Sequence, residues 1–335
     1  MTEETSRPAL AGAADRAIAA MDALAWQERR LELPFTLGER PVRTVRYAGL
    51  LALPDPFSTT AFDDPPPPCG ALAAHGRRAA FVYSCPVSAS LPRLAVRRGH
   101  VRYVPSQYPH YAVDVGGAFD DYCAGFRGKT LSTIRRKVRK AAATNRERPL
   151  IVCHRTPAEL ESFFDHALPI SRRSYQQRLF GNGLPETEAF RDRVMERAER
   201  GEILGFVLFL HDRPAAYTLC PRTTPGTVLY DHTGYDPEHD QLSPGTVLQF
   251  GIIETLFDEP EVRTYDLCTG GGRHKELFAT RSQPCANIHF AALVSLPALA
   301  ALAHCLVTMA NEAAVALLDA LNLRERVKKL IRRRA

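Results

Sequence analysis

Three residues at the start of a predicted helix have the chemistry of an anion-binding site. Ser243-Pro244-Gly245 follows a polar loop and precedes an apolar helical pattern that runs to about Phe257. The serine hydroxyl can accept a hydrogen bond from an exposed first-turn amide, and proline suits the first helical position because it has no N–H. Gly245 lacks a Cβ and lets a ligand approach the backbone. The free amides and the helix dipole favour a phosphate, although a plain loop-to-helix junction has the same residues.

Further polar side chains stand at the ends of two predicted strands. The strand over residues 227–232 ends in His232, and the strand over residues 262–268 contains Asp266 and ends in Cys268. An imidazole can accept a proton near neutral pH, although a strand histidine is more often packed or exposed. A carboxylate can act as a base or cap the glycine turn that follows. Because no His and Asn in triad order accompany the cysteine, a covalent acyl-enzyme is not favoured.

Basic side chains accompany these segments. Lys275 follows three glycines at the start of a short helix, where it could contact a phosphate or a carboxylate, or form a surface ion pair. The predicted helix over residues 119–143 has one apolar face, and basic residues crowd the rest. These basic residues are Arg135, Arg136, Lys137, Arg139 and Lys140. They form either a basic wall beside a phosphate-bearing ligand or a solvated surface.

The composition is that of an ordinary globular protein. The chain has 335 residues, 45% hydrophobic and 24% charged, with a net charge of +6. This modest charge fits acidic or phosphorylated small molecules at least as well as nucleic acid, whose binding proteins usually concentrate their basic residues. The sequence shows no RNA-binding or zinc-finger motif, so nucleic acid is not the expected partner.

The cysteines and the N-terminus indicate a cytoplasmic protein. Eight cysteines are scattered without a Cys-x-x-Cys pair, which predicts buried thiols in a reducing compartment and no metal site. The first residues, MTEETSRP, are polar and acidic, so no secretory signal peptide is predicted.

Two C-terminal segments bear on membrane contact. Residues 290–310 carry no charge and are long enough to span a bilayer, but Pro297 and the alanine-rich sequence after it favour a buried strand followed by a packed helix. Residues 323–335 form a basic helical pattern that could contact acidic lipid or RNA, or remain solvated.

The pattern predicts an α+β protein with four parts. Residues 1–30 read as a tail with an alanine-rich helix, and residues 31–115 as a β-rich segment. Residues 116–295 alternate strands and helices, and residues 296–335 read as C-terminal helices with a basic tail.

Within the third part, specific elements are predicted. Thr156 caps a helix that starts at Pro157, and a hairpin joins strands over residues 203–210 and 214–220. The polar, aromatic-containing segment 171–183 lines a substrate mouth or simply connects two helices.

The order of these elements resembles the GNAT acyltransferase core. The segment Gly234–Leu248, GYDPEHDQLSPGTVL, looks like the acyl-CoA loop of the CelD-like branch, whose members are associated with cellulose biosynthesis. Asp266, Gly270–Gly272 and the Lys275-Glu276-Leu277-Phe278 segment resemble that branch's strand-end Asp, glycine and Lys-x-x-aromatic segment. The sequence departs from the pattern at His274, where the branch often has Tyr, and in the single glycine of the loop.

The resemblance implies a GNAT-like, mostly antiparallel twisted sheet flanked by helices, with residues 31–115 as a degenerate GNAT-like first half. The CelD-like branch is similar in architecture to the Fem-type aminoacyl transferases. The implied reaction is acyl transfer from acetyl-CoA or another acyl-CoA, as a co-substrate, to an amine or less readily a hydroxyl. The acceptor is a small molecule, namely a sugar-, lipid- or amino-acid-linked amine, and no metal is needed because the thioester is already activated.

The resemblance also implies the roles of individual residues. The site lies between Tyr230–Thr233 and Tyr265–Cys268, where two GNAT strands splay. The candidate bases are Asp266, His232 and Asp231, with Tyr235 or Tyr265 as a proton donor to the thiolate. The cofactor loop comprises Leu242, Ser243, Gly245, Thr246, Val247 and Leu248. Lys275, Tyr265 and Arg136 are candidate substrate contacts. Asp266 is the leading base, and a structural carboxylate is its alternative.

Two other functions fit the same sequence. One keeps the fold but takes aminoacyl-tRNA as donor, with the basic helix and tail contacting RNA. The other is a non-catalytic GNAT-like binding module in polysaccharide assembly, which the single-glycine loop allows.

Overall fold

The computed structural model describes residues 7–37, 40–174, 183–224, 226–270 and 272–320. The chain forms two compact units: unit 1 comprises Met1–Pro109 with Gln283–Ala335, and unit 2 comprises His110–Ser282. The chain passes between units inside strands β5 (His100–Asp114) and β12 (Arg281–Ala292). Residues 283–295, which the sequence grouped with the transferase-like part, therefore belong with the N-terminal segment.

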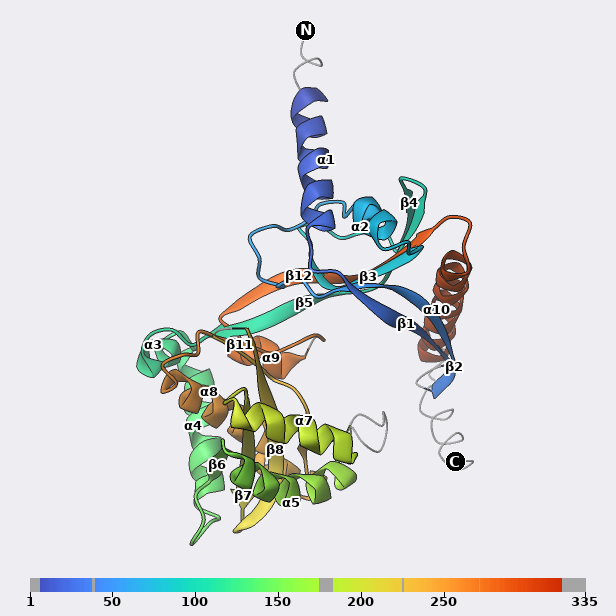
Figure 1. The fold of residues 1–335 in the computed structure, drawn as a ribbon. Helices are drawn as coiled ribbons and strands as arrows, with labels where there is room; N and C mark the ends of the chain where they lie inside the picture. The colour runs from blue at the N-terminus through green and yellow to red at the C-terminus, as the bar shows by residue number, and fades with distance from the viewer. Residues whose placement is uncertain (1–6, 38–39, 175–182, 225, 271, 321–335) are drawn as a thin grey trace. The chain divides into compact units, whose positions relative to one another are not determined.

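The described residues of unit 1 form a sheet with three helices (Figure 1). Its strands lie in the order β1-β2-β3-β12-β5, with β4 beside β5. The remaining elements are α1 (Arg7–Asp22), β1 (Gln27–Leu37), β2 (Arg40–Ala52), α2 (Cys69–Ala74), β3 (Ala79–Pro86), β4 (Leu94–Arg97) and α10 (Leu296–Ala320). The core between them includes Met21, Leu50, Val82, Ile288 and Phe290. Strand β1 was not predicted, and within the segment predicted to be β-rich β4 forms a hairpin with the long β5.

Helix α10 packs by one side only. Ala301 and Cys305 are buried with Leu33 of β1 and Tyr103 of β5, while large apolar side chains on its other side are exposed. Of the described helices, α10 is long and apolar enough to cross a membrane by length and composition, and 17% of its most apolar window is buried. The predicted packed helix is therefore covered along one face and open along the other. Residues 323–335, with the predicted basic helix, lie outside the described part of the chain.

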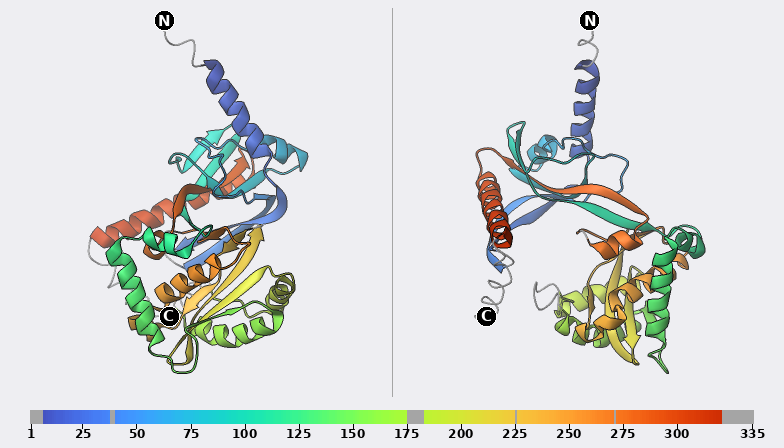
Figure 2. Two further views of the ribbon diagram at one scale, coloured as in Figure 1. Left: turned by 90° about the vertical axis from the view of Figure 1, so that its left-hand side faces the viewer. Right: turned by 180° about the vertical axis from the view of Figure 1, so that it is seen from behind.

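Unit 2 is a mostly antiparallel sheet with helices on both faces, as the two views of Figure 2 show. The end of β5 is followed across the sheet by β11, β9, β8, β7 and β6, and β10 also pairs with β8. Only the β9–β11 pair among those described in this unit is parallel. The strands are β6 (Ile151–His154), β7 (Ile203–Leu210), β8 (Arg213–Thr224), β9 (Thr227–Leu229), β10 (Thr233–Tyr235) and β11 (Thr264–Asp266). The helices are α3 (Phe119–Ala124), α4 (Gly128–Ala142), α5 (Pro157–Arg173), α7 (Glu188–Glu199), the 3-10 helix η1 (Pro237–Leu242), α8 (Pro244–Phe257) and α9 (Arg273–Phe278). The predicted α+β class is confirmed.

Strand β7 is buried on both faces, which explains its uninterrupted apolar sequence ILGFVLFL. Val207 and Phe209 pack with Phe163 of α5 and Val194 of α7. Phe206 and Leu208 pack on the opposite face with the core residues of α4 and α8. This double burial fixes α8, and therefore its N-terminus, against the centre of the sheet.

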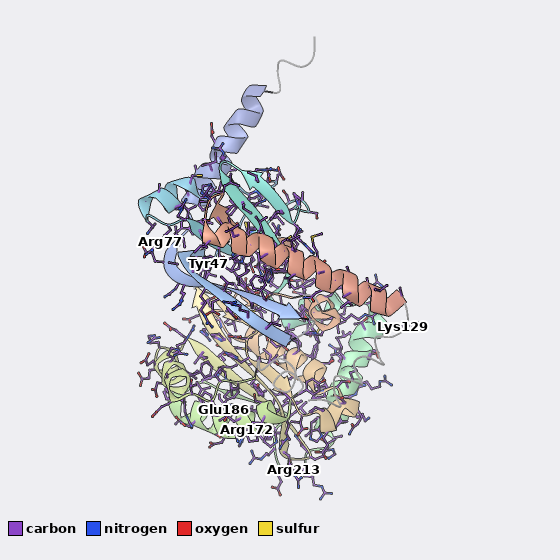
Figure 3. All side chains as sticks on the ribbon, turned by 90° about the vertical axis from the view of Figure 1, so that its right-hand side faces the viewer. Tyr47, Arg77, Lys129, Arg172, Glu186 and Arg213 are labelled. Atoms are coloured by element: carbon purple, nitrogen blue, oxygen red, sulfur yellow. The ribbon has the colours of Figure 1, made fainter. Side chains whose placement is uncertain are left out.

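Polar contacts fix the start of α5 and join its end to the segment just before α7. The predicted cap is confirmed, since Thr156 Oγ1 accepts from Glu159 N while the Glu159 carboxylate accepts from Thr156 N, a capping box. Figure 3 labels Arg172 and Glu186, whose side chains form two hydrogen bonds of 3.0 and 2.6 Å. Most of the predicted 171–183 loop, residues 175–182, lies outside the described residues.

The predicted helix over residues 119–143 is two helices. Arg127 is extended, with φ −61° and ψ 135°, and separates α3 from α4. Aromatic packing accounts for the break: Phe119 lies against Phe250 and Phe257, and Tyr122 donates a hydrogen bond to Phe278 O at 2.9 Å. These tertiary contacts outweigh the continuous helical pattern.

Candidate functional site

The site forms where residues 230–232 separate β9 from β10, next to the end of β11. β9 and β10 both pair with β8, with Val228 opposite Arg222 and Thr233 opposite Thr218. Between them, residues 230–232 leave the ladder, although Leu219 N still donates to His232 O at 3.1 Å. β11 runs parallel to β9 only as far as Asp266, whose carbonyl accepts from Tyr230 N at 2.8 Å. β10 pairs with β8, and no pairing of the described strands joins β10 to β11.

The start of α8 lies at the same place, but Ser243 does not cap it. Ser243 is left-handed, with φ 54° and ψ 53°, and its side chain makes no capping hydrogen bond. It ends η1 as well as preceding α8, and its amide donates to Asp240 O at 2.9 Å. The predicted serine cap is therefore wrong. Because Pro244 has no N–H, the first amides at this end of the helix are those of Gly245 and Thr246, with no side-chain cap.

An open cavity of about 940 Å³ joins these features within unit 2. Its walls include residues 230–235 from the strand interruption and residues 243–246 from the helix start. Leu248 and Gln249 of α8, Cys268 and Thr269 after β11, and His274 and Lys275 of α9 complete much of the lining. A side-chain Cβ placed on Gly245 meets nothing within 4 Å, so the backbone here faces open space. The volume is that of a small-molecule or cofactor site.

Asp266 lies behind this cavity and does not line it. Its Oδ1 accepts from Cys268 N at 2.7 Å and lies 2.6 Å from His110 Nε2. Both side chains are nearly buried, with 11% of the Asp266 side chain and 4% of the His110 side chain exposed. The carboxylate thus orders the turn after β11. Its role as a base stays a prediction.

His232 and Tyr235 both line the cavity. His232 Nε2 lies 3.8 Å from Asp231 Oδ2, and its ring meets Phe190 edge-on, with ring centroids 5.2 Å apart. Burial, together with the adjacent Asp240 carboxylate, raises the pKa of the Tyr235 phenol. A histidine able to accept a proton and a phenol that retains its proton therefore line one cavity.

Lys275, Cys268 and His274 form another part of the cavity lining. Lys275 Nζ donates to Thr269 O at 2.6 Å and to Cys268 O at 3.4 Å, and burial lowers its pKa. Burial also raises the pKa of the Cys268 thiol to about 12, which disfavours a thiolate nucleophile. Burial, followed by the Lys275 ammonium, lowers the pKa of His274 and favours a neutral imidazole.

The other predicted residues do not line the cavity. Tyr265, Leu242 and Val247 are buried in the unit 2 core, and Arg136 is exposed on α4. Sequence reasoning missed His110, because its strand has no pattern that marks a partner for Asp266. It also missed Gln249, although a lone glutamine in the apolar run VLQFGII was a visible signal.

One comparison with known protein families finds a match within unit 2. Residues 128–276, less than half of the chain, match the family model for an acetyltransferase (GNAT) domain. A search of curated protein sequences finds no match. Unit 2 therefore contains a GNAT acetyltransferase-like domain, which supports a transferase.

Several solved structures are similar over most of their length. One is the C-terminal domain (DUF2156) of a putative lysylphosphatidylglycerol synthetase from Agrobacterium fabrum, at 14% identity and TM-score 0.47, covering 92% of this chain and 91% of that one. Another is L-PGS from Bacillus licheniformis, at 12% identity and TM-score 0.47, with coverages of 88% and 96%. A third is FemX, at 8% identity and TM-score 0.44, with coverages of 82% and 95%.

Proposed function

We propose that unit 2 transfers an acetyl or other acyl group from acyl-CoA to an amine. One observation carries the proposal: the uncapped start of α8 and the interruption between β9 and β10 line the same open cavity. The first can hold a diphosphate and the second can admit a thioester. The acetyltransferase (GNAT) domain match over residues 128–276 supports the same reaction class.

The donor would lie along the cavity from the helix to the strands. The amides of Gly245 and Thr246, at the positive end of the α8 dipole, suit the pyrophosphate of CoA. The open space at Gly245 allows that group to approach the backbone. The pantetheine arm then extends toward residues 230–233, where the strand leaves its neighbour.

In the proposed reaction the amine nitrogen attacks the thioester carbonyl carbon, the C–S bond breaks, and CoA thiolate leaves. The amine proton passes to a base, and a proton is returned to the sulfur. His232 is the base best placed in the cavity, with Asp231 beside it, and Tyr235 is a proton donor for the thiolate. Asp266 would act indirectly, because its carboxylate accepts a hydrogen bond from Cys268 N and so holds the turn after β11.

We further propose that the acceptor is a sugar-, lipid- or amino-acid-linked amine in the cytoplasm, in polysaccharide or cell-envelope metabolism. The resemblance of Gly234–Leu248 to the CelD-like loop supports this assignment. The exposed basic residues of α4, including Arg136, add positive charge to unit 2 and suit anionic ligands. The same charge also suits the alternative donor, aminoacyl-tRNA.

Calorimetry with acetyl-CoA tests the donor. Gly245→Trp should abolish binding because a Cβ on Gly245 meets nothing within 4 Å and the indole would extend from there into the cavity. Gly128→Trp is the matched control: Gly128 also begins a helix and has nothing within 4 Å of a built Cβ, but it does not line the cavity.

Each outcome selects one function. Acetyl-CoA binding by the wild type and by Gly128→Trp, but not by Gly245→Trp, supports the proposal. Activity that requires aminoacyl-tRNA and is lost on RNase treatment favours the Fem-type reaction. If the wild type binds neither acetyl-CoA nor aminoacyl-tRNA, the non-catalytic binding module is the favoured function.

A further inference from the structure

Gln249 is a buried polar side chain that the reaction described so far does not use. It lies in the apolar helix α8 and is 2% exposed. Neither Oε1 nor Nε2 of its amide has a hydrogen-bond partner among the described residues. An amide removed from water without partners is unfavourable, so such groups are rare in folded proteins. Gln249 is also part of the cavity lining, where a ligand can supply the missing partners.

No other cavity-lining residue in the described part of the chain shares this property. Among the described residues that line the cavity, Gln249 alone has buried side-chain atoms without a hydrogen-bond partner. Thr218 and Thr233, for example, hydrogen-bond each other at 3.1 Å, and Tyr230 donates to Thr233 at 3.2 Å. The cavity therefore offers one amide with an unused donor and an unused acceptor.

The position of Gln249 on α8 indicates which part of a ligand it meets. Gly245 and Gln249 are four residues apart, so they lie on one face of the helix, separated by about one turn or roughly 5 Å. A ligand whose phosphate meets the helix start thus passes Gln249 about one turn farther on. In acyl-CoA, a short branched chain of about that length separates the pyrophosphate from the first pantetheine amide.

We propose that Gln249 binds a pantetheine amide of the acyl donor, which makes it a binding residue of the site; the inference rests on the proposed function. A primary amide is complementary to a secondary one, since each has a donor and an acceptor. The amide atoms of Gln249 are themselves covered, so binding requires rotation about its flexible side-chain bonds.

Calorimetry of Gln249→Leu with two probes tests the assignment. The leucine keeps similar volume and removes both amide groups, so the variant should be at least as stable as the wild type. Acetyl-CoA should bind about tenfold more weakly, the equivalent of one or two neutral hydrogen bonds. Adenosine 3′,5′-bisphosphate, which lacks the pantetheine arm, should bind equally to both proteins. Gln249→Met provides the same test if the leucine variant does not fold.

The failures are distinguishable. If the wild type binds acetyl-CoA and both variants bind it equally well, Gln249 is not a pantetheine contact, although the proposed function stands. An equal loss for both probes indicates a general change in the cavity and also overturns the assignment. A wild type that binds neither probe overturns the proposed function, and the assignment of Gln249 with it.

Discussion

His232 is the side chain whose replacement should change catalysis most directly. His232→Gln removes the base in the cavity while retaining a polar side chain of similar reach, so we expect turnover to fall by about 10²–10⁴-fold with acetyl-CoA affinity unchanged. Steady-state kinetics and calorimetry measure the two effects. His100→Gln, at a half-buried histidine of unit 1, is the control and should retain wild-type turnover. Unchanged turnover in His232→Gln would remove it as the base.

Replacing Asp266 distinguishes the two roles that the sequence left open, a catalytic base and a structural carboxylate. Asp266→Asn weakens the contacts of the buried carboxylate with His110 and the Cys268 amide, so we expect a loss of about 1–3 kcal/mol of unfolding free energy. Denaturant unfolding measures this loss. If stability were unchanged while turnover collapsed, Asp266 would instead be the base that the family resemblance implied.

Cys268 provides a prediction on pH. Burial raises the pKa of its thiol from 9.0 to about 12, so the folded protein holds the proton through the range in which a free thiol ionises. We expect iodoacetamide at pH 8 to alkylate Cys268 in the native chain roughly a hundredfold or more slowly than in urea, because the thiolate is the reactive form. Peptide mass spectrometry measures the rate.

The sign of the linked stability change follows from the same shift. Because the folded-state pKa is the higher one, this thiol's contribution to stability is fully present below about pH 9 and declines as pH rises toward 12. Rapid native alkylation at pH 8 would contradict this picture and reopen the acyl-enzyme alternative.

At the scale of elements, the two helix starts of α5 and α8 show what local sequence can and cannot predict. Thr156 and Glu159 supply both halves of a capping box within four residues, and that prediction is confirmed. Ser243 has the same residue class at the same kind of position. However, η1 ends on it, and the left-handed backbone that joins η1 to α8 leaves its side chain without a capping bond. A cap requires an extended backbone, which depends on the preceding element.

This difference predicts unequal effects of two similar substitutions. Thr156→Ala should lower the free energy of unfolding by about 1 kcal/mol, the usual effect of removing a cap. Ser243→Ala should lower it by less than about 0.5 kcal/mol because no capping bond is lost. Urea unfolding of both variants gives the comparison. Equal losses would mean that Ser243 caps α8 in solution.

The sheet of unit 2 was more predictable than its helices. The β7–β8 hairpin follows from two apolar runs around a short polar turn, because adjacent strands pair locally. The α3–α4 break depends on contacts of Phe119 and Tyr122 with α8 and α9, which are far apart in sequence. The expected position of the site came from the family resemblance, whereas the His110–Asp266 contact joins residues 156 positions apart that no local pattern relates.

At the scale of the whole molecule, unit 1 has an exposed apolar surface that the proposed reaction in unit 2 does not explain. Leu299, Leu302, Leu306 and Met309 recur every three or four residues along α10 and are exposed, so they form one stripe. Residues 323–335, which follow in sequence, contain seven basic residues and one acidic residue. Apolar side chains next to a basic segment are the combination that suits an anionic lipid surface.

We therefore expect the chain to bind vesicles peripherally through α10 and the basic segment. It should co-sediment with vesicles of phosphatidylglycerol and phosphatidylcholine but not with phosphatidylcholine alone, and added salt should weaken binding because the basic charges are screened. Leu306→Glu should reduce binding severalfold, since it places a charge in the apolar stripe. Val96→Glu, which replaces an exposed apolar residue on β4 of the same unit, is the control and should leave binding unchanged. The wild type could instead bind neither kind of vesicle, and the Leu306→Glu variant could differ from it in oligomeric state. The stripe would then be a contact between copies of the chain.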